Sequence, residues 1–163
     1  MIRLTPIKEH NAGAFALGVK VNENQQQLGN FNFSERLAFA YVEWATTGKQ
    51  PLAFGIAHGE STPVGFLIIS FDENDPDDYV SGDLTCYYID VFCIDENHQG
   101  KGYAKAALKE AIEFIKILPQ GEAKSIYADT LPQNEAMRKT FASAGFVETE
   151  DSDEDYIRVR YAL

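Results

Sequence analysis

The chain has 163 residues and a mass of 18.2 kDa, is 45 % hydrophobic and 24 % charged, and carries a formal net charge of −11. This composition is typical of a globular domain and excludes collagen, coiled coil and wholesale disorder. No apolar run approaches the roughly 20 residues of a membrane span, and the first residues do not fit a signal peptide. We therefore expect one domain over residues 1–163, soluble and cytoplasmic, with no membrane or nucleic-acid partner.

Apolar residues recur at strand or helix spacing through the first half of the chain. Ser34 precedes an apolar stripe at i, i+4 spacing, which predicts a helix that Ser34 caps. Two later apolar runs flank the turn-forming residues 58–63 and predict a β-hairpin. In chain order the expected elements are a strand at Ile2–Pro6, a helix at about Lys8–Val19, a polar stretch at Asn22–Asn32, a helix from Ser34 to near Gly48, and strands at Leu52–Ala57 and Val64–Phe71.

The second half contains the most apolar strand. Residues 86–94 are aromatic and β-branched, which predicts a strand buried on both faces. Pro119 is expected to stop the next helix, and Gly145 to end the one after it. The order of elements predicts an α/β or α+β mixed sheet with helices packed against it. The expected elements are strands at Cys86–Ile94 and Ser125–Asp129, helices at Ala104–Leu118 and Asn134–Ala144, and strands at about Phe146–Glu150 and Tyr156–Tyr161.

The cysteines and histidines predict neither a disulfide nor a metal site. Cys86 and Cys93 lie in one predicted strand, where their separation forbids a bond between them. We expect two buried, reduced thiols. His10, His58 and His98 lack metal-ligand spacing, so we predict no metal.

The negative charge is concentrated in two short segments. Residues 72–83 and 148–155 each hold six acidic residues and no basic ones, and together they carry −12. The rest of the chain is therefore almost neutral. Two such segments would attract a cation, although two solvated loops without a partner would have the same composition.

The junction between the buried strand and the third helix has the pattern of an anion site. Gly100 and Gly102 allow the backbone to approach a ligand closely, and a helix N-terminus presents free N–H groups to a phosphate. The junction is not a P-loop, because Gly102 follows Lys101 where Ser or Thr is required, and Lys105 replaces the last glycine of a dinucleotide fingerprint. A tight strand-to-helix turn alone could also require these glycines.

The same junction resembles a family signature. An asparagine ahead of a helix that ends in Gly-Phe, here Asn134 with Gly145 and Phe146, is similar to a second motif of that family. The two motifs have the order and the elements found in the GCN5-related N-acetyltransferases (GNAT), which this chain resembles. The residues that fit the first motif, Q/R-x-x-G-x-G/A, are Gln99, Gly100, Lys101, Gly102, Tyr103 and Ala104.

The resemblance implies a GNAT fold, with a mostly antiparallel central sheet, one splayed pair of parallel strands and flanking helices. It also implies acetyl-CoA as the donor. The pantetheine arm would pair with strand backbone where the parallel strands separate, and the pyrophosphate would bind the amides of residues 99–104. The implied cofactor-binding residues are Phe92, Cys93, Ile94, Gln99, Gly100, Lys101, Gly102, Tyr103, Ala104 and Asn134.

Two catalytic candidates follow from the same resemblance. An acceptor amine arrives as an ammonium ion and needs a base. Asp90 stands in the aromatic strand where relatives carry an acidic residue; burial is expected to raise its pKa, and it would act through a water. It could instead only anchor a backbone group or a cation. Relatives often have a general-acid tyrosine where this chain has Phe141. A thiolate is a tolerable leaving group without it; Tyr127 and Tyr103 are candidate substitutes, unless both only pack.

The resemblance also bears on the acceptor. Residues 89–96, with Val21, Asn24 and Gln25, resemble bacterial spermine/spermidine (diamine) N-acetyltransferases. We expect direct acetyl transfer to a primary amine of a small polycation such as spermidine or spermine, by a homodimer on family analogy. The alternatives are acetylation of protein N-termini, Lys or aminoglycosides, and a regulatory module that binds acetyl-CoA without catalysis.

The family topology also leads us to expect that the strands following the two acidic segments run parallel. Both segments would then lie at the end of the sheet away from CoA. There they would concentrate a polycationic acceptor.

Overall fold

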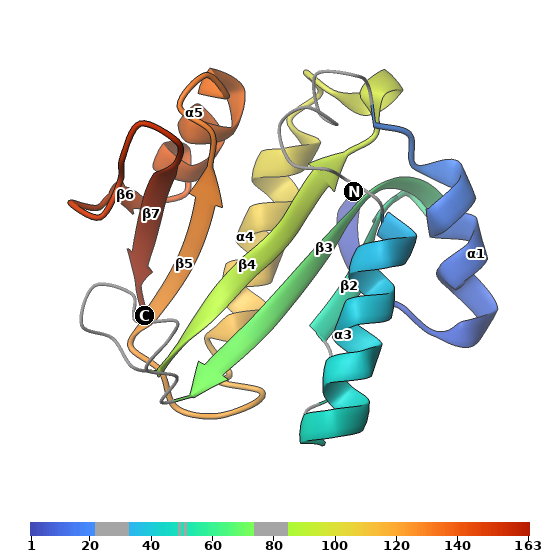
Figure 1. Cartoon of the computed structure of the whole chain (residues 1–163). Helices are drawn as coiled ribbons and strands as arrows, with labels where there is room; N and C mark the ends of the chain where they lie inside the picture. Colours follow the sequence, from blue (N-terminus) through green and yellow to red (C-terminus); the bar gives the residue numbers. More distant parts are fainter. Residues whose placement is uncertain (22–32, 49, 51, 74–84) are drawn as a thin grey trace.

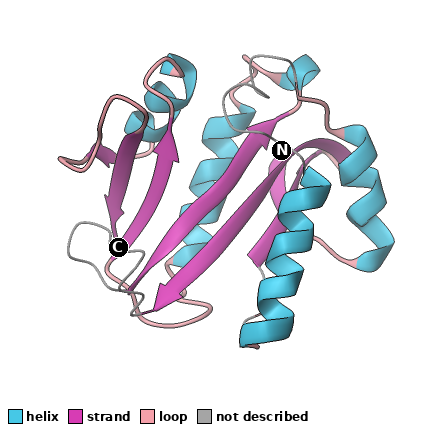
Figure 2. Ribbon diagram, viewed as in Figure 1, coloured by secondary structure: helices cyan, strands magenta, loops and turns pink. Residues whose placement is uncertain are grey.

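The fold is given by a computed structural model over residues 1–21, 33–48, 50, 52–73 and 85–163. One mixed sheet has the strand order β1-β2-β3-β4-β5-β7-β6, and helices cover both of its faces (Figures 1 and 2). The elements are β1 (Ile2–Pro6), α1 (Glu9–Gly18), α3 (Phe33–Thr47), β2 (Leu52–His58), β3 (Thr62–Glu73), β4 (Thr85–Ile94), the 3₁₀ turn η1 (Glu96–His98), α4 (Tyr103–Ile115), β5 (Ser125–Thr130), α5 (Glu135–Ser143), β6 (Val147–Glu148) and β7 (Ile157–Ala162).

The predicted mixed sheet is confirmed, and its elements differ from the expected ones mainly at their ends. Helix α3 begins at Phe33, so Ser34 lies inside the helix and the expected cap position was wrong. Helix α4 ends before Leu118, which has a positive φ of 52° and closes a tight turn on Ile115. Strand β6 has only two residues. The polar stretch at 22–32 lies outside the described residues.

No helix in the described part of the chain is both long and apolar enough to span a bilayer.

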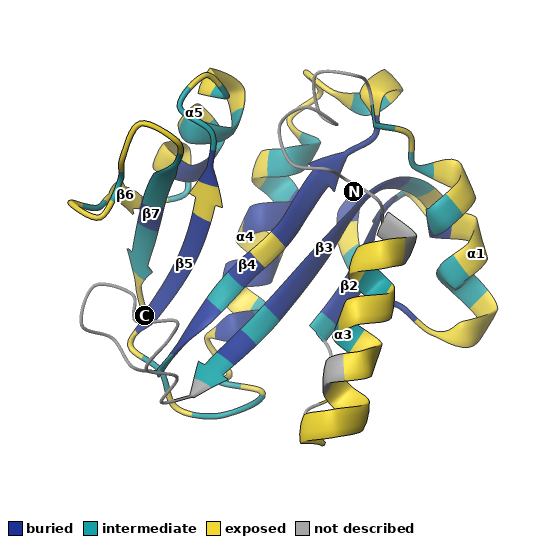
Figure 3. Ribbon diagram, viewed as in Figure 1, coloured by how far each residue is buried: buried dark blue, intermediate teal, exposed yellow. Residues whose placement is uncertain are grey.

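Strand β4 lies between two apolar layers, which confirms the expected burial on both faces (Figure 3). On one side Ile89 and Phe92 belong to the larger core cluster, with residues of α4. On the other side Val91 and Cys93 belong to a second cluster with Phe15 of α1. Cys86 and Cys93 are buried free thiols, as predicted. Burial on both faces fixes the position of β4 and of the residues that follow it.

The β4 strand is irregular at one residue, Asp90. Ile68 of β3 is in register with Val91, but the next residue, Ile69, is in register with Ile89, so Asp90 is the extra residue of a β-bulge. Parallel pairing between β4 and β5 also ends here, with Ile89 opposite Ala128. Beyond this point both strands continue without pairing to each other, and Figure 1 shows them diverging. The bulge and the divergence therefore coincide.

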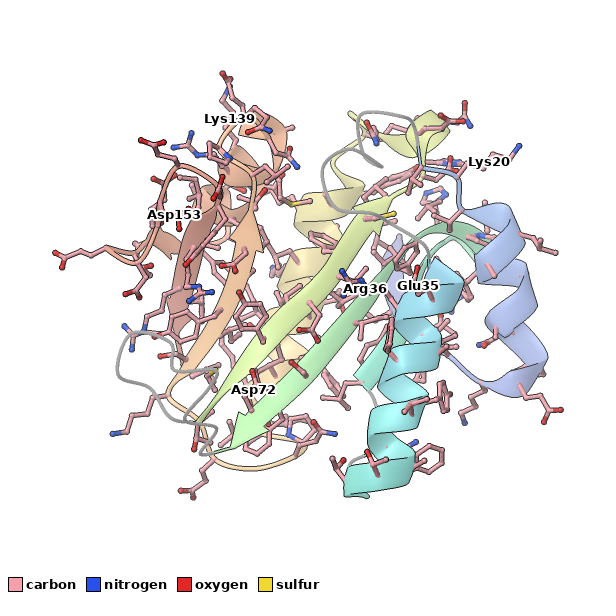
Figure 4. The ribbon with its side chains drawn as sticks, viewed as in Figure 1. Lys20, Glu35, Arg36, Asp72, Lys139 and Asp153 are labelled. Atoms are coloured by element: carbon pink, nitrogen blue, oxygen red, sulfur yellow. The ribbon has the colours of Figure 1, made fainter. Side chains whose placement is uncertain are left out.

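Contrary to the expectation, the second acidic segment, which precedes β7, lies at the end of the sheet where β4 leads into α4, and the described start of the first segment lies at the other end. Strand β5 is parallel to β4 but antiparallel to β7, so β7 runs opposite to β4. The expectation that these strands run parallel was wrong, because β6 and β7 form an antiparallel hairpin that reverses β7. Asp72 and Asp153, one from each segment, lie at opposite ends of the sheet (Figure 4). Residues 74–84 of the first segment lie outside the described residues.

The contact between β3 and β4 leads to a prediction about stability. A Cβ at Gly65 would overlap the backbone carbonyl oxygen of Cys93 on the neighbouring strand. Because backbone must move to relieve this overlap, we expect Gly65→Ala to lower the free energy of unfolding by about 1–3 kcal/mol. Gly13 of α1 has no atom within 4 Å of the corresponding position, so Gly13→Ala should raise it by about 1 kcal/mol. Denaturant unfolding measures the free energy of unfolding of both variants. A Gly65→Ala variant as stable as the wild type would contradict the tight packing of β3 on β4.

Candidate functional site

A pocket of about 630 Å³ lies where β4 and β5 separate. Its walls are the free edge of β4, the η1–α4 junction, α5 and Arg36, which Figure 4 shows on the side of α3 facing β4. Lys101 alone among the predicted cofactor residues is outside this lining, and its Nζ donates to the Asn97 carbonyl oxygen at 2.8 Å. The predicted residues that line the pocket are Asp90, Phe92, Cys93, Ile94, Gln99, Gly100, Gly102, Tyr103, Ala104 and Asn134.

One end of the pocket is suited to an anion. Gly100 and Gly102 have φ values of 72° and 77°, a region that favours glycine, and no atom lies within 4 Å of where a Cβ would stand. Gly102 precedes α4 and offers no side chain to cap it, so the first N–H groups of the helix are available to a ligand. Lys105, in the first turn of α4, lines the pocket and adds a positive charge. A phosphate would therefore meet backbone donors and a cation.

The middle of the pocket is an extended backbone edge. Phe92, Cys93 and Ile94 lie past the last β4–β5 pair, so the side of β4 toward β5 can hydrogen-bond an extended ligand. Burial, followed by the nearby charge of Asp95, raises the pKa of the Cys93 thiol to about 12. The thiol therefore stays protonated near neutral pH and is not a nucleophile.

Two carboxylates lie at the point where the strands part. Asp90 and Asp129 each come one residue after the last β4–β5 pair, and both line the pocket. Asp90 is exposed, so the expected burial was wrong: the bulge turns it out of the core. Ser70 Oγ donates to Asp90 Oδ1 at 3.2 Å. Arg158 donates to both oxygens of Asp129, from Nε at 2.9 Å and from Nη2 at 3.0 Å.

Comparison with known proteins agrees with this geometry. Residues 14–146 match the model of the Acetyltransferase (GNAT) family. The chain belongs to the GNAT family. Like the relatives that define this family, it is an acetyl-CoA-dependent N-acetyltransferase. A search of curated protein sequences finds no match.

Solved structures share the GNAT fold at low sequence identity. Spermidine N-acetyltransferase from Vibrio cholerae, in complex with CoA and spermine, is 17 % identical over 99 % of this chain and 95 % of its own, with a TM-score of 0.70. Ribosomal-protein-S5-alanine acetyltransferase from Vibrio fischeri is 18 % identical over 99 % and 92 %, with a TM-score of 0.66. The ribosomal-protein-S18-alanine N-acetyltransferase from Escherichia coli is 18 % identical over 100 % and 94 %, with a TM-score of 0.64. The named acceptors of these enzymes differ, so the shared fold does not identify the acceptor of this GNAT protein.

The general-acid candidates of this GNAT protein occupy different surroundings. Tyr127 is fully buried in a cluster with Cys86 and Tyr88 and does not line the pocket. The described residues thus do not place it beside the reacting groups, and its catalytic role stays a prediction. Phe141 lines the pocket near Phe92, with their ring centroids 6.5 Å apart, and has no proton to donate. Tyr103 lines the pocket at the start of α4.

The sequence did not single out several residues of the GNAT pocket. Asp129 could be found only from the β4–β5 register, because a carboxylate after a strand is common by itself. Lys105 lines the pocket and Lys101 does not, and this difference depends on how the loop enters α4. Among the described residues, no group of His, Cys, Asp and Glu is arranged to hold a metal ion. The remaining lining residues not predicted are Arg36, Ile89, Val91, His98, Thr130, Ala136, Met137 and Thr140.

The anion end of the pocket gives the second prediction. Gly102→Glu would put a bulky carboxylate in front of the first N–H groups of α4. We expect acetyl-CoA binding to be lost in isothermal titration calorimetry. Gly59→Glu is the matched control, because Gly59 has a similar φ of 67°, has open space around it and lies outside the pocket lining. Unchanged affinity of Gly102→Glu would contradict a phosphate seat at this helix.

Proposed function

We propose that this protein acetylates a primary amine of a small polycation, of the spermidine and spermine class. The observation that carries the proposal is the pair Asp90 and Asp129, which line the pocket where β4 and β5 part. A carboxylate attracts an ammonium group, and one of the two is well placed to accept its proton. The acceptor amine would therefore meet the donor at the divergence of the strands.

The donor fits the other two parts of the pocket. The first turn of α4, with Gly102 and Lys105, would hold the pyrophosphate of CoA. The backbone of Phe92, Cys93 and Ile94 would pair with the pantetheine arm, and Asn134, whose side chain caps α5, stands on the opposite wall. Acetyl-CoA supplies a thioester that a free amine can attack.

Asp90 acts as the base in this proposal. Its carboxylate takes a proton from the acceptor ammonium, through a water because the side chain is short. The freed nitrogen lone pair then attacks the thioester carbonyl carbon, so that the C–N bond forms and the C–S bond breaks. CoA leaves as the thiolate, and the second proton lost by the nitrogen makes it the thiol. The Ser70 hydroxyl orients one Asp90 oxygen. Since the Cys93 thiol stays protonated, transfer is direct and does not pass through an acyl-cysteine. A thiol with a pKa near roughly 8.5 is a tolerable leaving group without the missing tyrosine at Phe141.

Asp129 has a different part in the proposal. Arg158 donates to both of its oxygens and so fixes the position of the Asp129 carboxylate, which leaves Asp90 as the base in this proposal. Burial and then the nearby Asp129 raise the pKa of Tyr88 above its ordinary value, so Tyr88 stays a neutral neighbour. The charge of Asp129 would position the acceptor ammonium next to Asp90.

The second acidic segment supports a polycation. Thr130 of β5 is in register with Ile157 of β7, so this segment, which ends just before β7, lies at the same end of the sheet as Asp129. Arg138 pairs with Glu148, but the other carboxylates of the segment are exposed. An acceptor with a second ammonium group would find negative charge beyond Asp129.

A panel of acceptors tests the function. The release of CoA thiol is measured with spermidine, spermine, a peptide with an N-terminal alanine and an aminoglycoside. We expect the highest kcat/KM with a polyamine. A preference for the peptide would favour an N-terminal acetyltransferase. If none of the acceptors gives release of CoA thiol, a binding module is favoured.

The third prediction concerns the base. Asp90→Asn should lower kcat about 100-fold or more and leave the acetyl-CoA Kd unchanged, because the amide cannot accept the proton. Asp72→Asn is the control, since it removes a carboxylate from the neighbouring strand outside the pocket lining. A kcat of Asp90→Asn within threefold of wild type would show that Asp90 is structural.

The fourth prediction concerns charge steering. Replacing Asp151, Glu154 and Asp155 by their amides should raise the KM for spermidine, and the difference should shrink as the Debye length falls from roughly 10 Å at 0.1 M salt to about 3 Å at 1 M. Asp153 is kept because it accepts from the backbone N–H groups of Asp155 and Tyr156.

The control for charge steering removes the same number of exposed carboxylates elsewhere, at Glu9, Glu60 and Glu122. It should leave this KM unchanged. Equal effects of the two triple variants would indicate only a change in net charge.

A further inference from the structure

Asp95 is a buried carboxylate that the proposed chemistry does not use. It follows β4, is 3 % exposed and does not line the pocket. Its oxygens accept from Lys20 N at 2.7 Å, Asn97 N at 3.0 Å and His98 Nδ1 at 2.7 Å. Burial opposes its ionisation, but these donors outweigh burial and lower the pKa of Asp95. A buried charge with this set of donors holds its surroundings firmly in place.

Three segments meet at Asp95. The chain leaving α1 is held by both backbone groups of Lys20. Lys20 N donates to Asp95, and Lys20 O accepts from Glu96 N at 2.9 Å. Asp95 N donates to Val64 O of β3 at 2.8 Å. The exit of α1, the start of β3 and the junction leading to α4 are therefore fixed to each other at this point.

One of the Asp95 donors reaches the pocket. His98 lines the pocket, and its ring stacks on Tyr103 with centroids 6.3 Å apart and planes at 25°. Tyr103 also stacks on His58 of β2, at 5.0 Å and 21°. Tyr103 is the first residue of α4, whose backbone N–H belongs to the anion end of the pocket. Contacts thus run from Asp95 through His98 to the start of α4.

We propose that Asp95 is a positioning residue for the donor. Acting through His98, it holds residues 99–103 in the arrangement that accepts acetyl-CoA before the donor arrives, which reduces the cost of ordering this loop on binding. The inference rests on the donor seat of the proposed function, but not on the identity of the acceptor.

Asp95→Asn, His98→Ala and the double variant test the inference. We expect each single variant to raise the acetyl-CoA Kd about tenfold by calorimetry, while kcat at saturating acetyl-CoA stays within twofold of wild type. The double variant should bind acetyl-CoA no more weakly than the weaker-binding single variant, because both changes break the same contact.

Asp153→Asn is the matched control, since Asp153 also accepts backbone N–H groups in a turn but lies in the β6–β7 loop outside the pocket lining. It should leave the Kd unchanged. If Asp95→Asn lowers the Tm but not the acetyl-CoA affinity, Asp95 only stabilises the fold and the inference is overturned.

His98→Ala keeps the inference testable if Asp95→Asn does not fold, because the His98 side chain is 28 % exposed. An unchanged Kd for His98→Ala would overturn the inference as well. Failure of the polyamine proposal is a separate outcome, because the acetyl-CoA Kd is measured without an acceptor.

Discussion

The end of parallel pairing between β4 and β5, at Ile89 and Ala128, is the constraint on which the site depends. Both strands are buried on the sides that face the core, so neither can shift to restore the ladder. The bulge at Asp90 falls at the same place. The strand edge for the donor and the two carboxylates for the acceptor both result from this one interruption.

Charge divides the pocket between the two substrates. The start of α4 and Lys105 make one end positive, whereas Asp90 and Asp129 make the point of divergence negative. Arg158 binds both oxygens of Asp129 and offsets part of this negative charge. The second acidic segment lies past the end of β5, at the same end of the sheet as the start of α4 but beside β7, two strands away from β4. Within the pocket, the positive start of α4 and the negative point of divergence separate an anionic donor from a cationic acceptor while their reacting ends meet.

The sequence predicted the features that depend on local pattern, and missed those that depend on pairing between strands. The order of elements, the buried strand and the glycine loop follow from periodicity and from residues 99–104. The bulge does not, because it depends on the register between β3 and β4, which the residues of β4 alone do not reveal. Asp129 and the reversal of β7 likewise depend on which strand lies beside β5. Asp95 looked like a loop residue, since its donors come from segments far away in sequence.

Amide hydrogen exchange of β4, with and without CoA, tests most directly whether the donor is seated at the divergence of the strands. The account predicts that amides among Phe92, Cys93 and Ile94 exchange more slowly when CoA is added. The amides of Tyr87–Ile89, already paired with β5, should not change. Binding of CoA without any slowing at residues 92–94 would contradict the account, because the donor would then be held elsewhere.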